Sequence, residues 1–133
     1  MSIEDLKKQF IVDDDALKTR LEPLITKALN YCRISKSGEV LITNSKLSAK
    51  DQIMLTLSAR AIASQLDSAI SANVAVADLH KSTGLPTNQI RARANEIVAA
   101  KLATSPQAGE FRAIPHKIEA FLDGLAGPRG NKD

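Results

Sequence analysis

Residues 76–93 read VADLHKSTGLPTNQIRAR, and the fold that the sequence predicts depends mainly on this stretch. A short helix is expected to end at Gly84, because glycine readily adopts the positive φ angle found where many helices end. A second helix is expected to begin around Pro86 or Thr87, since proline is tolerated in the first turn of a helix. Two helices joined by so short a turn cross at a steep angle.

A long helix is expected before this pair, at residues 48–66. Its start resembles a capping box, because Asp51 follows Ser48 at the required spacing. Its apolar residues form two stripes that together cover most of the helix circumference. The sequence therefore predicts that this helix lies at the centre of the fold.

Short strands and a last helix are expected around the helix pair. One strand is expected within residues 72–76, and two more at 103–105 and 110–114, on either side of a hairpin turn. Pro115 is expected to open an amphipathic helix. Residues 127–133 are expected to form a flexible tail.

The order helix, short strand, helix, turn, helix, hairpin and helix resembles the winged-helix domain, a helix-turn-helix fold. The resemblance implies that the helix at 87–102 enters the major groove of double-stranded DNA. It also implies that the hairpin at 103–114, the wing, contacts the flanking backbone or minor groove. His80 departs from the family pattern, in which this position is usually small. Its imidazole is expected either to widen the angle between the helices or to point outward.

The N-terminal third of the chain repeats this pattern. Residues 3–25 align with residues 76–98 at a fixed offset, and a first hairpin is expected at 31–43. We therefore predict a mainly α fold with small β-hairpins. It comprises two tandem winged-helix-like units, a degenerate one at 1–46 and a second at 47–126, which share the long central helix.

The first unit is expected to be a structural or dimerising partner and not a DNA reader. Asp13, Asp14 and Asp15 stand where the second unit has residues 86–88. Carboxylates suit the positive end of a helix, but they would repel the phosphates of a nucleic acid. Pro23 is also expected to interrupt the matching helix.

The polar side chains of the helix after the turn are the candidate DNA contacts. Amides pair well with adenine, arginine pairs with guanine, and small apolar groups contact the thymine methyl. The candidate base-reading residues are Thr87, Asn88, Gln89, Arg91, Ala92 and Asn95. Cations that could reach phosphates are Arg93, Lys101, Arg112 and Lys117. The alternative is a solvated helix surface, on which Arg93 and Lys101 pair with Glu96 or with other nearby acidic residues.

Charge and cysteine content restrict the class of protein. The chain has 133 residues and a net charge of +3, and residues 68–117 hold six cations against three anions, which is the whole excess. Cys32 is the single cysteine, which excludes an intrachain disulfide and is typical of a reducing compartment. Because no signal peptide or membrane span is recognisable, we expect a cytoplasmic protein, associated with the nucleoid if it binds DNA.

Catalysis is not expected. Neither His80 nor His116 has a partner at metal-ligand spacing, and no phosphate-binding loop or nucleophile motif occurs. We therefore predict no enzymatic activity, no cofactor, no metal and no small-molecule substrate. Cys32 falls in an alternating strand pattern, where a buried and inert thiol is the usual state.

The sequence therefore predicts a double-stranded-DNA-binding protein, a small transcriptional regulator. The alternative is a winged-helix module that binds a protein in a larger complex. A homodimer is expected because two segments carry apolar stripes, although these segments could instead pack on each other within one chain. The stripe residues are Ile118, Phe121, Leu122 and Leu125 in the last helix and Leu6, Phe10 and Ile11 near the N-terminus.

Overall fold

The computed structural model describes residues 2–3, 16–44 and 46–126, and these form a mainly helical fold with two small antiparallel sheets. In chain order the elements are α2 (Ala16–Thr19), α3 (Leu21–Ala28), β1 (Cys32–Ile34), β2 (Val40–Ile42), α4 (Ala49–Leu66), β3 (Val74–Ala75), α5 (Val76–Thr83), α6 (Thr87–Ala99), β4 (Ala103–Thr104), β5 (Glu110–Ala113) and α7 (Pro115–Ala126). The aspartates at 13–15, the stripe residues Leu6, Phe10 and Ile11, and the expected tail at 127–133 lie outside the described residues.

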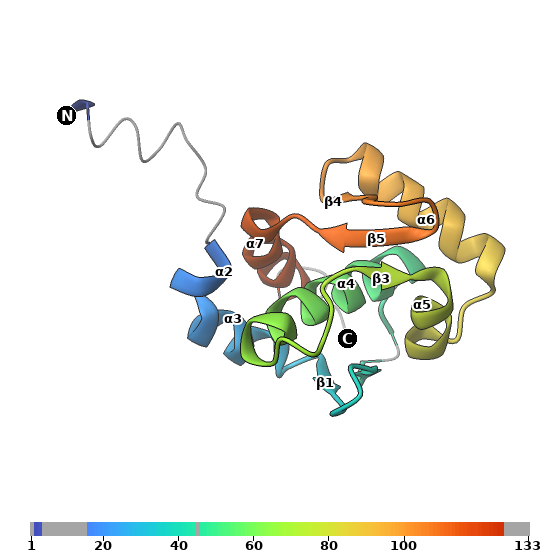
Figure 1. Cartoon of the computed structure of the whole chain (residues 1–133), viewed down its shortest axis with the longest axis horizontal. Coiled ribbons are helices and arrows are strands. Elements are labelled where there is room, and N and C mark those ends of the chain that lie inside the picture. The colour runs from blue at the N-terminus through green and yellow to red at the C-terminus, as the bar shows by residue number, and fades with distance from the viewer. Residues whose placement is uncertain (1, 4–15, 45, 127–133) are drawn as a thin grey trace.

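α4 is the central helix, as the sequence predicts. The Ser48 hydroxyl accepts a hydrogen bond from the Asp51 amide at 3.1 Å and caps its N-terminus. α4 contacts α2, α3, α5, α6, α7, β1, β2 and β5, and Figure 1 shows it running through the middle of the molecule. One hydrophobic core extends from Leu17 to Leu125, so both halves of the chain bury their apolar side chains against this helix.

α5, the turn and α6 follow the predicted pattern closely. α5 ends at Gly84, which has a φ of +74°, and α6 begins at Thr87 directly after Pro86. The Leu85 amide donates a hydrogen bond to the Thr83 hydroxyl at 3.1 Å, which ties the turn to the end of α5. His80 points outward, and its ring nitrogen Nδ1 lies 2.7 Å from the Leu85 carbonyl oxygen.

The C-terminal hairpin is present, and it is part of a larger sheet. β4 and β5 pair antiparallel with Thr104 opposite Arg112, and Gly109 in the turn has a φ of +79°. β3 pairs with the other edge of β5, so the three strands lie in the order β3-β5-β4. Each strand is one residue or more shorter than its expected range. The first expected hairpin is also present, as β1 and β2.

Two expected helix boundaries are wrong. The helix expected at 87–102 ends at Ala99, because Lys101 adopts a left-handed φ of +64° that closes the helix. Pro23 does not interrupt α3; it lies in the first turn, where its missing N–H is not needed. The break falls earlier, at Arg20, between α2 and α3.

α7 packs within the chain, against α2, α3 and α4. The side chains of Ile118, Leu122 and Leu125 are at most 2% exposed, so this stripe belongs to the intrachain core. Ion pairs join the same helices, with Glu119 accepting from Arg20 at 2.6 Å and from Lys27 at 2.7 Å. None of the helices in the described residues is long and apolar enough to cross a membrane.

Candidate nucleic-acid interface

α6 has one buried face and one open face. Ile90, Ala94 and Ile97 are fully buried against the core. The opposite face is exposed, and the residues along its centre recur at the spacing of one helical stripe. This outward stripe consists of Asn88, Ala92, Asn95 and Ala99, all of them exposed. The structure therefore brings three of the predicted base-reading residues, Asn88, Ala92 and Asn95, into one line.

The remaining predicted base-reading residues flank this stripe. Thr87, Gln89 and Arg91 are exposed at the N-terminal part of α6. The side-chain oxygen of Asn88 accepts a hydrogen bond from the Gln89 amide at 2.9 Å, which satisfies one N–H group of the first turn. Because this bond occupies only the oxygen, the two N–H donors of the Asn88 amide still face outward for a partner.

Arg93 differs from the other candidates. It is partly buried, and its guanidinium pairs with the Glu96 carboxylate one turn further along, at 2.9 Å. This is the pairing that the solvated-surface alternative describes for Arg93. An exposed pair of this kind contributes little to stability, but it neutralises the one anion on the open side of α6.

The other three cations lie around the hairpin. Lys101 is exposed in the tight turn after α6, where the Leu102 amide bonds the Ile97 carbonyl at 3.1 Å. Arg112 is exposed on β5, and Lys117 is partly buried near the start of α7. The Ile114 amide bonds the Leu102 carbonyl at 3.0 Å, which closes the base of the hairpin. Lys101 and Lys117 therefore lie within three residues of this closed base.

The sequence-based set omits Ala99 and Lys81. Ala99 continues the outward stripe of α6, and extending the helical spacing from Asn88, Ala92 and Asn95 by one more turn identifies it. Lys81 is exposed in the last turn of α5, just before the turn that leads into α6. Its place within the first helix of the pair was the available sequence signal for adding Lys81 to the candidate phosphate contacts.

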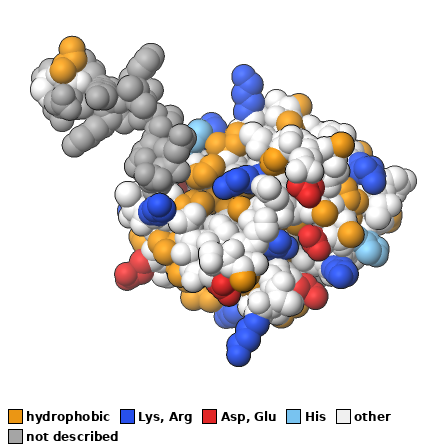
Figure 2. All heavy atoms as spheres, viewed as in Figure 1, with side chains coloured by type: hydrophobic (Ala, Val, Ile, Leu, Met, Phe, Trp, Pro, Cys, Tyr) orange, Lys and Arg blue, Asp and Glu red, His pale blue; other side chains and the backbone are white. Residues whose placement is uncertain are grey.

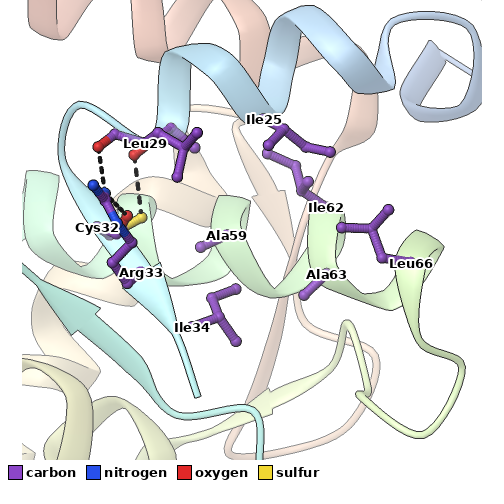
Figure 3. A pocket seen from close by; sticks show the side chains of 10 residues that line it. Ile25, Leu29, Cys32, Arg33, Ile34, Ala59, Ile62, Ala63 and Leu66 are labelled. Carbon is purple, nitrogen blue, oxygen red and sulfur yellow. Dashed lines mark hydrogen bonds between the residues drawn. The ribbon is translucent and has the colours of Figure 1, made fainter. Parts of the chain in front are cut away.

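A second surface feature lies away from α6, between α3, β1 and α4. It is an open groove of about 270 Å³ lined mainly by apolar side chains, with Cys32 among them (Figure 3). Burial raises the pKa of the Cys32 thiol to about 11, and the thiol lies 3.6 Å from the Ala28 carbonyl oxygen. At neutral pH this group is a protonated thiol, which is a poor nucleophile.

Neither a metal site nor a similarity to a known protein indicates the function of this chain. Within the described ranges, no three His, Cys, Asp or Glu side chains gather in a way that could hold a metal ion. Comparisons with protein families, with curated proteins and with solved structures found no match to this chain. The candidate site in the described residues is therefore the exposed surface of α5, α6 and the β4–β5 hairpin.

Proposed function

We propose that this chain is a winged-helix protein that binds double-stranded DNA and acts as a small transcriptional regulator. The observation that carries the proposal is the outward stripe of α6. A helix whose open face presents Asn88, Ala92 and Asn95 offers amide donors for adenine and a small apolar group for the thymine methyl. Short side chains also allow the backbone of α6 to approach the base edges closely.

The elements around α6 also support the proposal that this helix binds double-stranded DNA. In the proposed complex α6 enters the major groove, and the β4–β5 hairpin acts as the wing beside it. Lys101 and Arg112 are exposed on the hairpin side of α6, where they contact phosphates. α5 packs against α6, and the turn between them is held by the hydrogen bonds of Thr83 and His80.

The second candidate is a protein-interaction module that uses the same fold. The face shown in Figure 2 favours this candidate, because its lysine and arginine side chains are scattered among acidic ones and do not form one basic patch. Exposed leucines also occur, with Leu29 at 47% and Leu66 at 62% exposed. Leu29 and Leu66 both line the apolar groove between α3, β1 and α4. Exposed apolar surface is typical of regions that contact another protein.

Salt dependence separates the two candidates. Fluorescence anisotropy with a labelled random-sequence duplex measures affinity as the salt concentration rises. DNA binding releases counterions, so the logarithm of affinity falls linearly with the logarithm of salt, with a slope of about −0.9 per neutralised phosphate. Absence of any duplex binding above background at low salt contradicts the proposal and favours the protein-interaction module.

A further inference from the structure

The two asparagines of the outward stripe differ in the side-chain atoms that they present. The Asn88 oxygen accepts a hydrogen bond from the Gln89 amide at 2.9 Å, so it is held against its own helix. Asn95 lies two turns further along α6 and is exposed, and no hydrogen bond within the described residues involves its side chain. Asn88 therefore presents its N–H donors outward, whereas Asn95 presents both N–H donors and an acceptor oxygen.

The neighbours of Asn95 on the helix surface leave its amide accessible. Side chains three and four positions away lie beside it, and these are Arg91, Ala92, Val98 and Ala99. Ala92 and Ala99 are exposed, and their methyl groups are shorter than the asparagine side chain. None of these four neighbours carries a carboxylate, so none of them repels the anionic groove of a duplex. Asn95 can thus approach a base edge with both of its polar groups.

An amide that presents both groups matches one base in particular. In the major groove adenine presents the N7 acceptor beside the N6 donor, and a carboxamide pairs with them through two hydrogen bonds. Guanine presents two acceptors there, and cytosine presents a donor alone. A side chain that only donates, as Asn88 does, bonds N7 of either purine and does not separate adenine from guanine. The two asparagines are therefore suited to different tasks.

We propose that Asn95 is the residue of α6 that determines specificity for adenine, by pairing its amide with N6 and N7 of one adenine in the major groove. This inference rests on the proposed function and names the base that the outward stripe reads. Asn88 lies about 10 Å away along the helix axis, or about three base-pair steps, so the two side chains reach different base pairs. Asn88 contributes affinity and excludes cytosine, which has no acceptor on its major-groove edge.

Removal of one base atom tests the pairing of Asn95 with adenine. The probe is the duplex that the wild-type chain selects from a random pool, with each adenine of the motif replaced in turn by 7-deazaadenine. This base keeps the N6 amino group and pairs with thymine but lacks the N7 acceptor. At the adenine that Asn95 reads, anisotropy should show that wild-type affinity falls about 10-fold. Asn95→Ala should bind the unmodified duplex about 10-fold more weakly, and 7-deazaadenine at that position should then cause no further loss.

Two other asparagine variants are the controls. Asn88→Ala alters the same stripe and should weaken binding, but it should retain the effect of 7-deazaadenine at the adenine that Asn95 reads. Asn30→Ala, at an exposed position after α3, should leave both the affinity and the base effect unchanged. Circular dichroism checks that the variants fold. If Asn95→Ala does not fold, Asn95→Leu replaces it, because leucine has a similar size and no polar atom.

An effect of 7-deazaadenine that persists in Asn95→Ala at every adenine overturns the inference. Equal wild-type affinity for all the modified duplexes overturns it as well, and so does a selected motif without adenine. In these cases the proposed function stands, because the wild-type chain still selects a duplex. A wild-type chain that selects no duplex contradicts the proposed function itself, and the inference about Asn95 falls with it.

Discussion

The imidazole Nδ1 of His80 lies 2.7 Å from the carbonyl oxygen of Leu85, so α5 and the turn into α6 are joined by a side chain. Gly84 lies between them with a φ of +74°, and its amide bonds the His80 carbonyl at 2.8 Å. His80 thus bonds the turn twice, once through its backbone and once through its ring. These two bonds explain how the large side chain of His80 is accommodated beside the turn.

Replacing His80 with alanine should loosen this turn. Loss of one exposed hydrogen bond typically costs about 0.5–1 kcal/mol of the free energy of unfolding. Urea denaturation measures the loss, and Lys81→Ala, at the next exposed position of α5, is the matched control. Equal stability of His80→Ala and wild type would show that the ring contact does not hold the turn.

Residues on α6 and residues around the hairpin should respond differently to alanine substitution. Asn88→Ala and Arg91→Ala should each cost about 1–3 kcal/mol of binding free energy at the preferred sequence and relax the sequence preference. Lys101→Ala and Arg112→Ala should weaken binding to all duplexes alike and flatten the salt slope. Anisotropy with preferred and scrambled duplexes separates the two effects. An Arg91→Ala variant that weakens all duplexes equally would mean that α6 runs across the backbone.

Lys101 should show a trade-off between stability and binding. Its φ of +64° disfavours any side chain, so Lys101→Gly should raise the free energy of unfolding by about 1 kcal/mol. Lys101→Ala keeps the backbone strain and should not stabilise the fold. Both variants lose the cation, so both should bind DNA more weakly than wild type does. A Lys101→Gly variant with unchanged affinity would remove Lys101 from the interface.

Glu119 should make stability depend on pH in the acidic range. Hydrogen bonds from Arg20 and Lys27 lower the pKa of Glu119 from 4.5 to about 2. Because the folded-state pKa is lowered, the stabilisation is present above the unfolded pKa and is lost as pH falls from 4.5 toward 2. The Arg20 side chain is half exposed, so solvent screens the pair and the stabilisation is small.

Urea denaturation of Glu119→Gln across this pH range measures that contribution. The variant should be less stable than wild type at neutral pH, and the difference should shrink as the solution is acidified. Asp123→Asn is the matched control, because Asp123 is 57% exposed and forms its ion pair with Lys27. A difference between Glu119→Gln and wild type that stays constant with pH would contradict the account.

Local signals in the sequence predicted the fold best where one residue decides the geometry. Ser48 caps α4 and Gly84 ends α5 where the sequence indicates, because both effects depend on neighbouring residues alone. Lys101 gave no such signal, since lysine is atypical of the left-handed region. There the path of the chain into β4 overrides the local preference.

Features that depend on distant contacts could not be predicted in the same way. The pairing of β3 with β5 joins Val74 to Phe111, and no local pattern specifies it. The exposure of Leu66 likewise depends on how α3 and β1 pack beside α4. The outward stripe of α6 was predictable in large part, because the buried residues Ile90 and Ile97 identify the opposite face.

Selection of duplexes from a random-sequence pool tests the central claim, that the open face of α6 reads DNA. The wild-type chain and two variants with the same substitution are compared: Ala92→Glu in the outward stripe, and Ala120→Glu at an exposed position of α7. Wild type and Ala120→Glu should enrich one shared motif, whereas Ala92→Glu should enrich none, because its carboxylate faces the anionic groove. Failure of the wild-type chain to enrich any duplex, or enrichment of the same motif by Ala92→Glu, would contradict the claim.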